Sequence, residues 1–230
     1  KSGFIALIGR PNVGKSTLVN QLVGKKVSIT SPVAQTTRNR LKAILTTSSS
    51  QMVFVDTPGI HKPHHLLGER LVQSARKTLG EVDIIVLVFE GSCSPGRGDA
   101  FLVKLLESQH RSVLVVLNKW DLLSPDQYQT RRDEYQELLN KTNWPVFCCS
   151  AVTRNGCDGL LDAISSNLPF GPYLYPSDFL SDQPEKVLLG ELIREQVLIH
   201  TREEVPHSVA VSIDRIEEIT KESTKSGAKV

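Results

Sequence analysis

The chain has 230 residues, of which 40% are hydrophobic and 23% are charged, as in an ordinary soluble globular protein. No apolar run approaches the roughly 18 residues of a membrane-spanning helix, and four cysteines without a C-x-x-C pair predict reduced thiols rather than a disulfide scaffold. The net charge of +2 is uneven, because residues 1–177 carry 20 basic against 14 acidic side chains, and residues 178–230 carry 7 against 11.

The chain opens on a strand–loop–helix pattern. The apolar run Gly3–Ile8 predicts a strand, a glycine-containing turn at 9–14 follows it, and Lys15–Val23 has the spacing of an amphipathic helix. Residues 28–40 are polar and lack periodicity, so they predict a long loop. Such length inside a compact domain indicates function or mobility.

The next elements form a hairpin and then alternate between helix and strand. Strands are predicted by the apolar runs Leu41–Thr46, Met52–Asp56, Ile84–Phe89, Val113–Leu117 and Val146–Cys149. Helical spacing covers 65–79, Asp99–Glu107, Asp126–Asn140 and Gly159–Leu168. Continuous apolar strands are typical of parallel strands covered on both faces. We therefore expect an α/β, doubly wound and mostly parallel sheet of about six strands, with ligands at the carboxyl ends of the strands.

A second domain is expected near the end of the chain. Prolines and glycines at 169–176 mark a linker. Beyond it, Lys186–Val197 predicts an amphipathic helix and Ser208–Ile213 alternates like a strand. One helix and one strand cannot bury a core of their own. The expected division is a first domain at 1–170, a linker at 171–182 and the N-terminal fragment of a second, α+β domain at 183–230.

The turn Gly9-Arg10-Pro11-Asn12-Val13-Gly14-Lys15-Ser16 has the pattern of a phosphate-binding loop (P-loop), whose backbone N–H groups surround phosphate oxygens. In such a loop Lys15 reaches the β- and γ-phosphates, and the Ser16 hydroxyl binds Mg²⁺. The alternative, a glycine-rich turn beside a surface lysine, is disfavoured by the strand and helix patterns on either side. The residues assigned here to nucleotide binding are Asn12, Val13, Gly14, Lys15, Ser16 and Thr17.

Asp56-Thr57-Pro58-Gly59 follows a second apolar strand. A carboxylate there is costly without a partner, and Mg²⁺ supplies one directly or through water. Gly59 lets its backbone N–H approach the γ-phosphate. Ile60 stands where Ras-like enzymes place a glutamine that orients the attacking water. An aliphatic side chain cannot orient water, so we expect slow intrinsic hydrolysis and a substitute for the glutamine.

Asn118-Lys119-Trp120-Asp121 follows a third buried strand and indicates guanine. The Asp121 carboxylate can accept hydrogen bonds from guanine N1–H and N2–H₂, whereas adenine has an acceptor at N1 and no amino group at C2. Unpaired buried polar groups can reject a ligand by roughly 10⁴-fold, which favours GTP and GDP over ATP. In the last loop the Ala151 N–H would reach guanine O6. The residues assigned to the base are Asn118, Lys119, Asp121, Ser150, Ala151 and Val152.

A Mg²⁺-sensing threonine is expected in the loop 28–40. Thr36 or Thr37 could serve, with Thr37 favoured slightly, and a merely solvated loop is the alternative. Loops ordered by the γ-phosphate and Mg²⁺ are the usual switch device. The expected catalytic residues are Asn12, Lys15, Thr37, Asp56 and Gly59, and the expected Mg²⁺ ligands are Ser16, Thr37 and Asp56.

Together these motifs closely resemble the Era GTPases, in a wider group of translation-associated GTPases with a hydrophobic residue at the glutamine position. The resemblance has a cyanobacterial or plastid character and spans nearly the whole chain, through G-R-P-N-V-G-K-S, V-S-I-T-S-P-V-A-Q-T-T-R-N-R, D-T-P-G-I-H-K-P, L-N-K-W-D, L-P-F-G-P-Y-L-Y-P, E-L-I-R-E-Q and E-V-P-H-S-V-A-V. It implies a P-loop GTPase fold followed by a truncated KH-type RNA-binding domain, acting in 16S rRNA maturation and 30S subunit assembly.

The resemblance also implies a role for K⁺. In this group an asparagine of the P-loop can coordinate K⁺ beside the phosphates, and Asn12 matches that position. The KH domain of the family clamps RNA with a G-x-x-G loop. The glycines after Pro169 are Gly171, Gly190 and Gly227, none so spaced. We therefore expect this chain to bind RNA poorly.

We further expect a monomer in the bacterial cytoplasm or plastid stroma, with peripheral membrane association left open. Two other functions also stay open. One is a related translation GTPase acting on tRNA modification or the large subunit, against which the linker and E-V-P-H-S-V-A-V argue. The other is a scaffold that binds guanine nucleotides without hydrolysing them.

Overall fold

The computed structural model describes residues 1–30, 41–57, 59, 79–201 and 209–216. Its contacts divide the chain into two compact units, Lys1–Asp182 and Gln183–Val230. Thr36, Thr37, Ile60 and nearly all of the helix predicted at 65–79 lie outside the described residues, so those expectations stay predictions.

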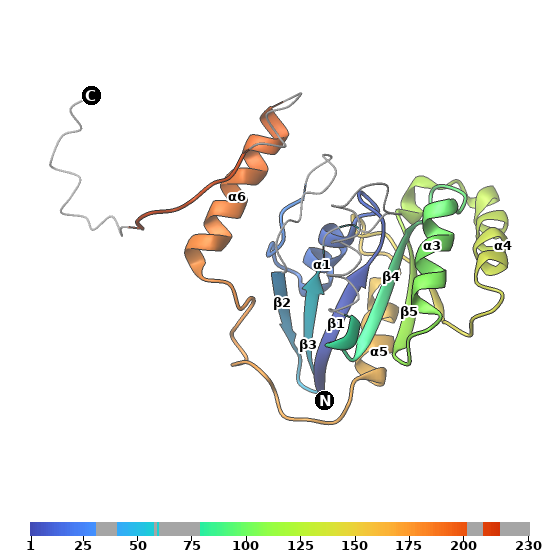
Figure 1. Ribbon diagram of the computed structural model, residues 1–230, viewed down its shortest axis with the longest axis horizontal. Helices are drawn as coiled ribbons and strands as arrows, with labels where there is room; N and C mark the ends of the chain where they lie inside the picture. Colours follow the sequence, from blue (N-terminus) through green and yellow to red (C-terminus); the bar gives the residue numbers. More distant parts are fainter. Residues whose placement is uncertain (31–40, 58, 60–78, 202–208, 217–230) are drawn as a thin grey trace, which may run out of the picture. The chain divides into compact units, whose positions relative to one another are not determined.

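A six-stranded sheet of order β2-β3-β1-β4-β5-β6 forms the centre of the first unit (Figure 1). Only β2 runs antiparallel to its neighbour, and the other pairs of adjacent strands are parallel. The α/β fold with a mostly parallel sheet of six strands is therefore confirmed. The strands are β1 (Ser2–Ile8), β2 (Leu41–Thr46), β3 (Gln51–Asp56), β4 (Ile84–Glu90), β5 (Ser112–Asn118) and β6 (Val146–Cys148).

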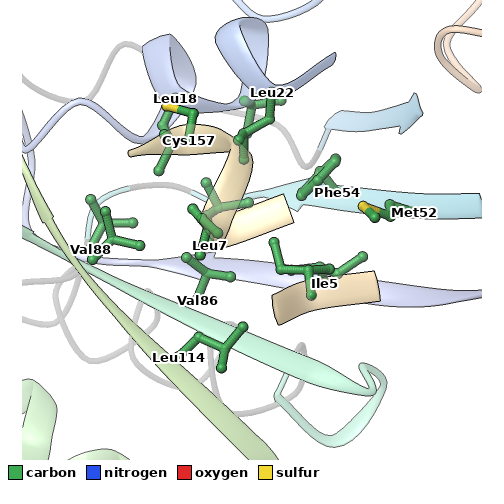
Figure 2. Close-up of a cluster of buried hydrophobic side chains, with 14 of the residues drawn as sticks. Ile5, Leu7, Leu18, Leu22, Met52, Phe54, Val86, Val88, Leu114 and Cys157 are labelled. Atoms are coloured by element: carbon green, nitrogen blue, oxygen red, sulfur yellow. The ribbon is translucent and has the colours of Figure 1, made fainter. Parts of the chain in front are cut away.

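Helices cover both faces of the sheet, as predicted. Successive side chains of a strand point to opposite faces, so β1 places Ile5 and Leu7 in one buried cluster and Ala6 and Ile8 in the other. Figure 2 shows the first cluster, in which helices α1 and α5 pack on the sheet. Helices α3 and α4 cover the opposite face. The helices are α1 (Lys15–Val23), α3 (Arg97–Leu106), α4 (Tyr128–Leu138) and α5 (Cys157–Asn167), with short 3₁₀ turns at Trp120–Leu122 and Pro125–Gln127.

The parallel strands bring the predicted motifs to one edge. β1 ends at the P-loop, β3 ends at Asp56, β5 ends at Asn118, and β6 is followed by Ser150. Carboxyl ends of parallel strands meet at the same edge of a sheet, where ligands of α/β proteins bind. The fold therefore supplies one place for all four motifs.

The opposite end of β3 fixes the segment predicted as a linker. The buried Gln51 accepts hydrogen bonds at Oε1 from the backbone N–H groups of Leu174 (2.7 Å) and Tyr175 (2.9 Å). Its Nε2 donates to the carbonyl oxygen of Tyr175 at 2.8 Å. Farther along, Ile44 N donates to the Leu180 carbonyl at 2.8 Å. One glutamine side chain thus satisfies three backbone groups of this extended segment.

Replacing Gln51 by Leu should lower the free energy of unfolding by about 2–4 kcal/mol, because backbone donors and an acceptor lose their partner at a buried position. Urea unfolding of the full chain measures this. Gln129→Leu is the matched control, since Gln129 lies exposed on α4 and bonds only within one helical turn, to Asp133. We expect that control to stay within about 0.5 kcal/mol of the parent. Equal effects of the two substitutions would contradict the anchoring role of Gln51.

The second unit contains helix α6 (Glu185–His200), close to the predicted Lys186–Val197. The strand predicted at Ser208–Ile213 is wrong over its described part, because residues 209–216 have no strand pairing. A strand needs a hydrogen-bonded neighbour, and the described part of this unit offers none. The segment instead lies against α6, where a Cβ added to Gly190 would come within 3.3 Å of the Val211 carbonyl oxygen. No helix among the described residues of the chain is long and apolar enough to cross a membrane.

Candidate nucleotide-binding site

The P-loop leaves β1 through backbone conformations that favour glycine. Gly14 has φ +91°, and Asn12, the only non-glycine residue of the loop with a positive value, has φ +64°. A Cβ added to Gly14 would lie 2.4 Å from Asn118 Nδ2, and one added to Gly9 would lie 2.4 Å from the Val88 carbonyl oxygen. Gly14 is also the N-cap of α1, so the loop ends at a helix N-terminus, which attracts phosphate.

Lys15 is buried and held by the loop's own backbone. Its Nζ donates hydrogen bonds to the carbonyl oxygens of Gly9 at 3.1 Å and Arg10 at 2.9 Å. Burial lowers the pKa of Lys15 from 10.5 to about 8, and the nearby Asp56 carboxylate partly opposes that shift. A poorly solvated ammonium beside a phosphate-binding turn gains strongly from an anionic ligand.

The lowered pKa of Lys15 predicts a rise in stability with pH. Between about pH 8 and 10.5 the unfolded chain keeps the Lys15 proton and the folded chain loses it, so unfolding takes up a proton. The free energy of unfolding without nucleotide should therefore increase by up to about 1.4 kcal/mol per pH unit above pH 8. Nucleotide affinity should fall over the same range, because the phosphates need the ammonium.

Urea unfolding from pH 7 to 9.5 tests this, with Lys15→Met as the reference that removes the titrating group. The quantity of interest is the difference in unfolding free energy between parent and variant, since other groups titrate in both. A difference that stays flat across pH 8 would contradict the lowered pKa.

The end of β3 supplies oxygen ligands beside the loop. Ser16 Oγ donates a hydrogen bond of 2.7 Å to Asp56 Oδ2, and the Asp56 carboxylate is fully buried. Thr57 Oγ1 donates to the Leu7 carbonyl at 2.6 Å and fixes the turn that follows. Gly59 approaches the P-loop closely, since a Cβ there would lie 2.7 Å from Pro11 N. A carboxylate and a hydroxyl in contact form the hard, all-oxygen set that Mg²⁺ prefers.

Asn118 joins the base motif to the P-loop. Its buried side chain donates from Nδ2 to the Val13 carbonyl at 2.8 Å and accepts at Oδ1 from Ala151 N at 3.0 Å. One amide thus connects three of the predicted motifs. Asn118 is 105 residues from Val13 and 33 residues from Ala151 in the chain. Because those bonds use both ends of the amide, the separation between the phosphate and base subsites is held by direct contacts.

The rest of the base loop surrounds this amide. Lys119 has φ +61°, and its Nζ pairs with Glu90 Oε1 at 2.7 Å. Asp121 is the second residue of the 3₁₀ turn Trp120–Leu122 and is exposed, so its carboxylate can meet a ligand from solvent. Ser150 Oγ accepts a hydrogen bond from Thr153 N at 3.0 Å, and Val152 is exposed beside it.

The structure thus brings the predicted nucleotide residues to one edge of the sheet, while Thr37 lies outside the described residues. Two contributors lie outside the predicted site motifs: Glu90, which pairs with Lys119, and Asp99, which pairs with Arg10 of the P-loop. The available signal was positional, because Glu90 ends an apolar strand and Asp99 lies in the first turn of a helix.

Comparison with known proteins extends these observations. The family described as 50S ribosome-binding GTPase matches residues 4–119. The GTPase Era of Rippkaea orientalis is 55% identical over 218 residues, which are 95% of this chain and 69% of that protein. The GTPase Era of a Synechocystis species is 53% identical with the same coverage of both chains.

Solved structures give the same result. The crystal structure of Era in complex with MgGDPNP and nucleotides 1506–1542 of 16S ribosomal RNA has a TM-score of 0.87 at 36% identity, covering 94% of this chain and 73% of that one. A variant of Aquifex aeolicus Era bound to GDP and AlF₄⁻ has a TM-score of 0.84 at 36% identity, with the same coverage.

Proposed function

Because the chain belongs to the Era family of GTPases, we propose that it uses GTP with Mg²⁺ as a conformational switch in 16S rRNA maturation and small-subunit assembly. The chain is a GTPase, since a GTPase family model and relatives named GTPase Era match it. The observation that carries the proposal is the Asn118 side chain, which bonds the P-loop at Val13 and the guanine loop at Ala151. That connection sets phosphate and base recognition within one ligand's reach.

The proposed roles combine the positions of the described side chains with the sequence motifs. Lys15 binds the phosphates through its ammonium group, which the Gly9 and Arg10 carbonyls hold at the start of the loop. Ser16 and Asp56 hold Mg²⁺, with Thr37 as the proposed third ligand, and the bound ion neutralises charge on the phosphates. Asn12, Val13, Gly14 and Thr17 complete the phosphate subsite. Gly59 offers its backbone N–H to the γ-phosphate, and slow hydrolysis follows from Ile60 at the glutamine position.

The direct test is competition binding of GTP and ATP to the purified chain. Because Asp121 pairs only with a guanine edge, GTP should bind at least about 10³-fold more tightly than ATP. Equal affinities would overturn the proposal. Turnover at saturating GTP separates a hydrolysing enzyme from a non-hydrolysing scaffold.

Asn12 is the proposed K⁺ ligand, and this predicts a cation effect on turnover. K⁺ beside the phosphates would offset the charge that develops during phosphoryl transfer, as an arginine finger does elsewhere. We expect hydrolysis to be at least about tenfold faster in KCl than in NaCl at equal ionic strength. Asn12→Ala should remove the difference between the two salts, because it removes the proposed K⁺ ligand. Equal rates in both salts for the parent would contradict a role for K⁺.

For residues 183–230 we propose the beginning of a KH-type domain. The supporting observations are the helix α6 and the likeness to an Era structure that contains 16S rRNA. The acidic excess of residues 178–230 supports weak RNA binding by this chain, and the basic excess of 1–177 fits contacts with an anionic partner, either RNA or a membrane surface. We also propose a monomer acting in the cytoplasm or the plastid stroma. The likeness to an Era structure that contains part of 16S ribosomal RNA favours the small subunit over tRNA modification or the large subunit.

A further inference from the structure

Asp99 on helix α3 is buried against the P-loop. Its Oδ1 lies 2.8 Å from Arg10 Nε, and its side chain is 0% exposed while that of Arg10 is 31% exposed. The second oxygen, Oδ2, accepts a hydrogen bond of 2.8 Å from Gly96 N at the start of the helix. The Arg10 stem lies along the same turn, because a Cβ added to Gly98 would come within 2.7 Å of Arg10 Cδ.

Helix capping alone does not explain this carboxylate. An asparagine side chain could accept the bond from Gly96 N equally well, without the cost of burying a charge. The negative charge gains its advantage from the Arg10 guanidinium, and Arg10 is the second residue of the P-loop. The pair therefore links a helix on one face of the sheet to the turn that receives phosphate.

Arg10 also contributes to the cradle of Lys15. Its carbonyl oxygen accepts a hydrogen bond of 2.9 Å from Lys15 Nζ, and the preceding Gly9 carbonyl accepts one of 3.1 Å. The start of the loop is held by Asp99 through Arg10, and its middle is held by Asn118 through Val13. Both anchors come from outside the loop.

We propose that Asp99 is a positioning residue for the nucleotide site, acting through Arg10. By fixing the Arg10 side chain it holds the Gly9 and Arg10 carbonyls, and with them the Lys15 ammonium, where phosphate oxygens bind. A site that is ordered in advance loses less conformational freedom when its ligand arrives. This inference rests on the proposed binding of guanine nucleotide.

Asp99→Asn is the test, because it keeps the size of the side chain and an acceptor for Gly96 N while removing the charge. We expect the Kd values of GTP and GDP to rise together by about tenfold, with kcat at saturating GTP changed less than about twofold. The preference for GTP over ATP should remain, since the base loop is untouched. Asp158→Asn is the matched control, because Asp158 forms a 2.8 Å pair with Arg154 at an exposed position on α5. Its Kd should equal that of the parent.

Two substitutions of Arg10, the residue that pairs with Asp99, test the proposal even if Asp99→Asn does not fold. Arg10→Lys keeps a cation for Asp99 and should hold GTP within about threefold of the parent, whereas Arg10→Met should lose about tenfold. The double variant Arg10→Met/Asp99→Asn should bind GTP no more weakly than the weaker of the two single variants, because both substitutions remove the same ion pair.

The outcomes separate the two proposals. Parent protein that binds GTP and ATP equally would overturn the guanine-nucleotide function itself. Parent protein that prefers GTP, together with Asp99→Asn at parental affinity or Lys and Met variants of Arg10 that bind alike, would overturn the positioning role alone. Thermal unfolding without nucleotide is the readout for a purely structural role. If kcat fell and Kd rose only in proportion to the loss of thermal stability, that result would also count against positioning.

Discussion

Asp121→Asn should change the nucleotide preference of this GTPase from guanine to xanthine. Guanine presents N1–H and N2–H₂ donors to the carboxylate, and an amide that replaces one carboxylate oxygen by an NH₂ group opposes one of them. Xanthine carries a carbonyl at C2, with which that NH₂ group can pair. We expect GTP affinity to fall by about 10³-fold or more, and XTP to bind the variant more tightly than GTP.

The structure supplies both the control and the internal check for this exchange. Asp126 lies exposed in the next 3₁₀ turn, so Asp126→Asn makes the same chemical change beside the base loop and should leave GTP affinity unaltered. Turnover of XTP by Asp121→Asn should approach that of GTP by the parent, because Lys15, Ser16 and Asp56 are unchanged. An unaltered preference for GTP in the Asp121 variant would remove the basis for the base assignment.

Sequence periodicity was sufficient for the described strands and helices of the first unit, because each of them has a local cause. Continuous apolar runs such as Ile84–Phe89 became buried strands, and β4 extends that run by only one residue. The strand predicted at Ser208–Ile213 failed for the opposite reason. Alternation describes which faces a strand could present, but pairing depends on a neighbour that the described residues of the second unit lack.

In the candidate site, too, some features could be predicted from the sequence and others could not. P-loop, Asp56 and Asn118 motifs are contiguous in the sequence, so their chemistry could be recognised before their positions were known. The contacts that hold them in place join distant residues and leave no linear pattern. Asn118 reaches Val13 across 105 residues, and Ser16 reaches Asp56 across 40. In the sequence Asp99 is only the first residue of the helix predicted at Asp99–Glu107, and no linear pattern connects it to Arg10, with which it pairs.

Gly14→Ala should abolish most nucleotide binding although it adds a single methyl group. The new Cβ would lie 2.4 Å from Asn118 Nδ2, well inside contact distance, at a residue with φ +91°. Asn118 cannot move aside without breaking its bonds to Val13 and Ala151, so the clash would displace both the phosphate and the base loops. We expect GTP and GDP affinity to fall by at least about a hundredfold. Stability without nucleotide should fall by about 2–4 kcal/mol.

Gly24→Ala distinguishes the clash from the backbone strain. Gly24 also has a left-handed conformation, φ +72°, but a Cβ there would meet no atom within 4 Å. Gly24→Ala should lose only the free energy of placing a non-glycine residue in the left-handed conformation, about 1 kcal/mol of stability. Its Kd for GTP should be unchanged. If the two alanine variants lost the same stability and Gly14→Ala still bound GTP normally, contact with Asn118 would not be what requires glycine in the P-loop. A large loss of stability and GTP affinity that is confined to Gly14→Ala would identify the contact with Asn118, rather than backbone strain, as the reason for glycine at this position.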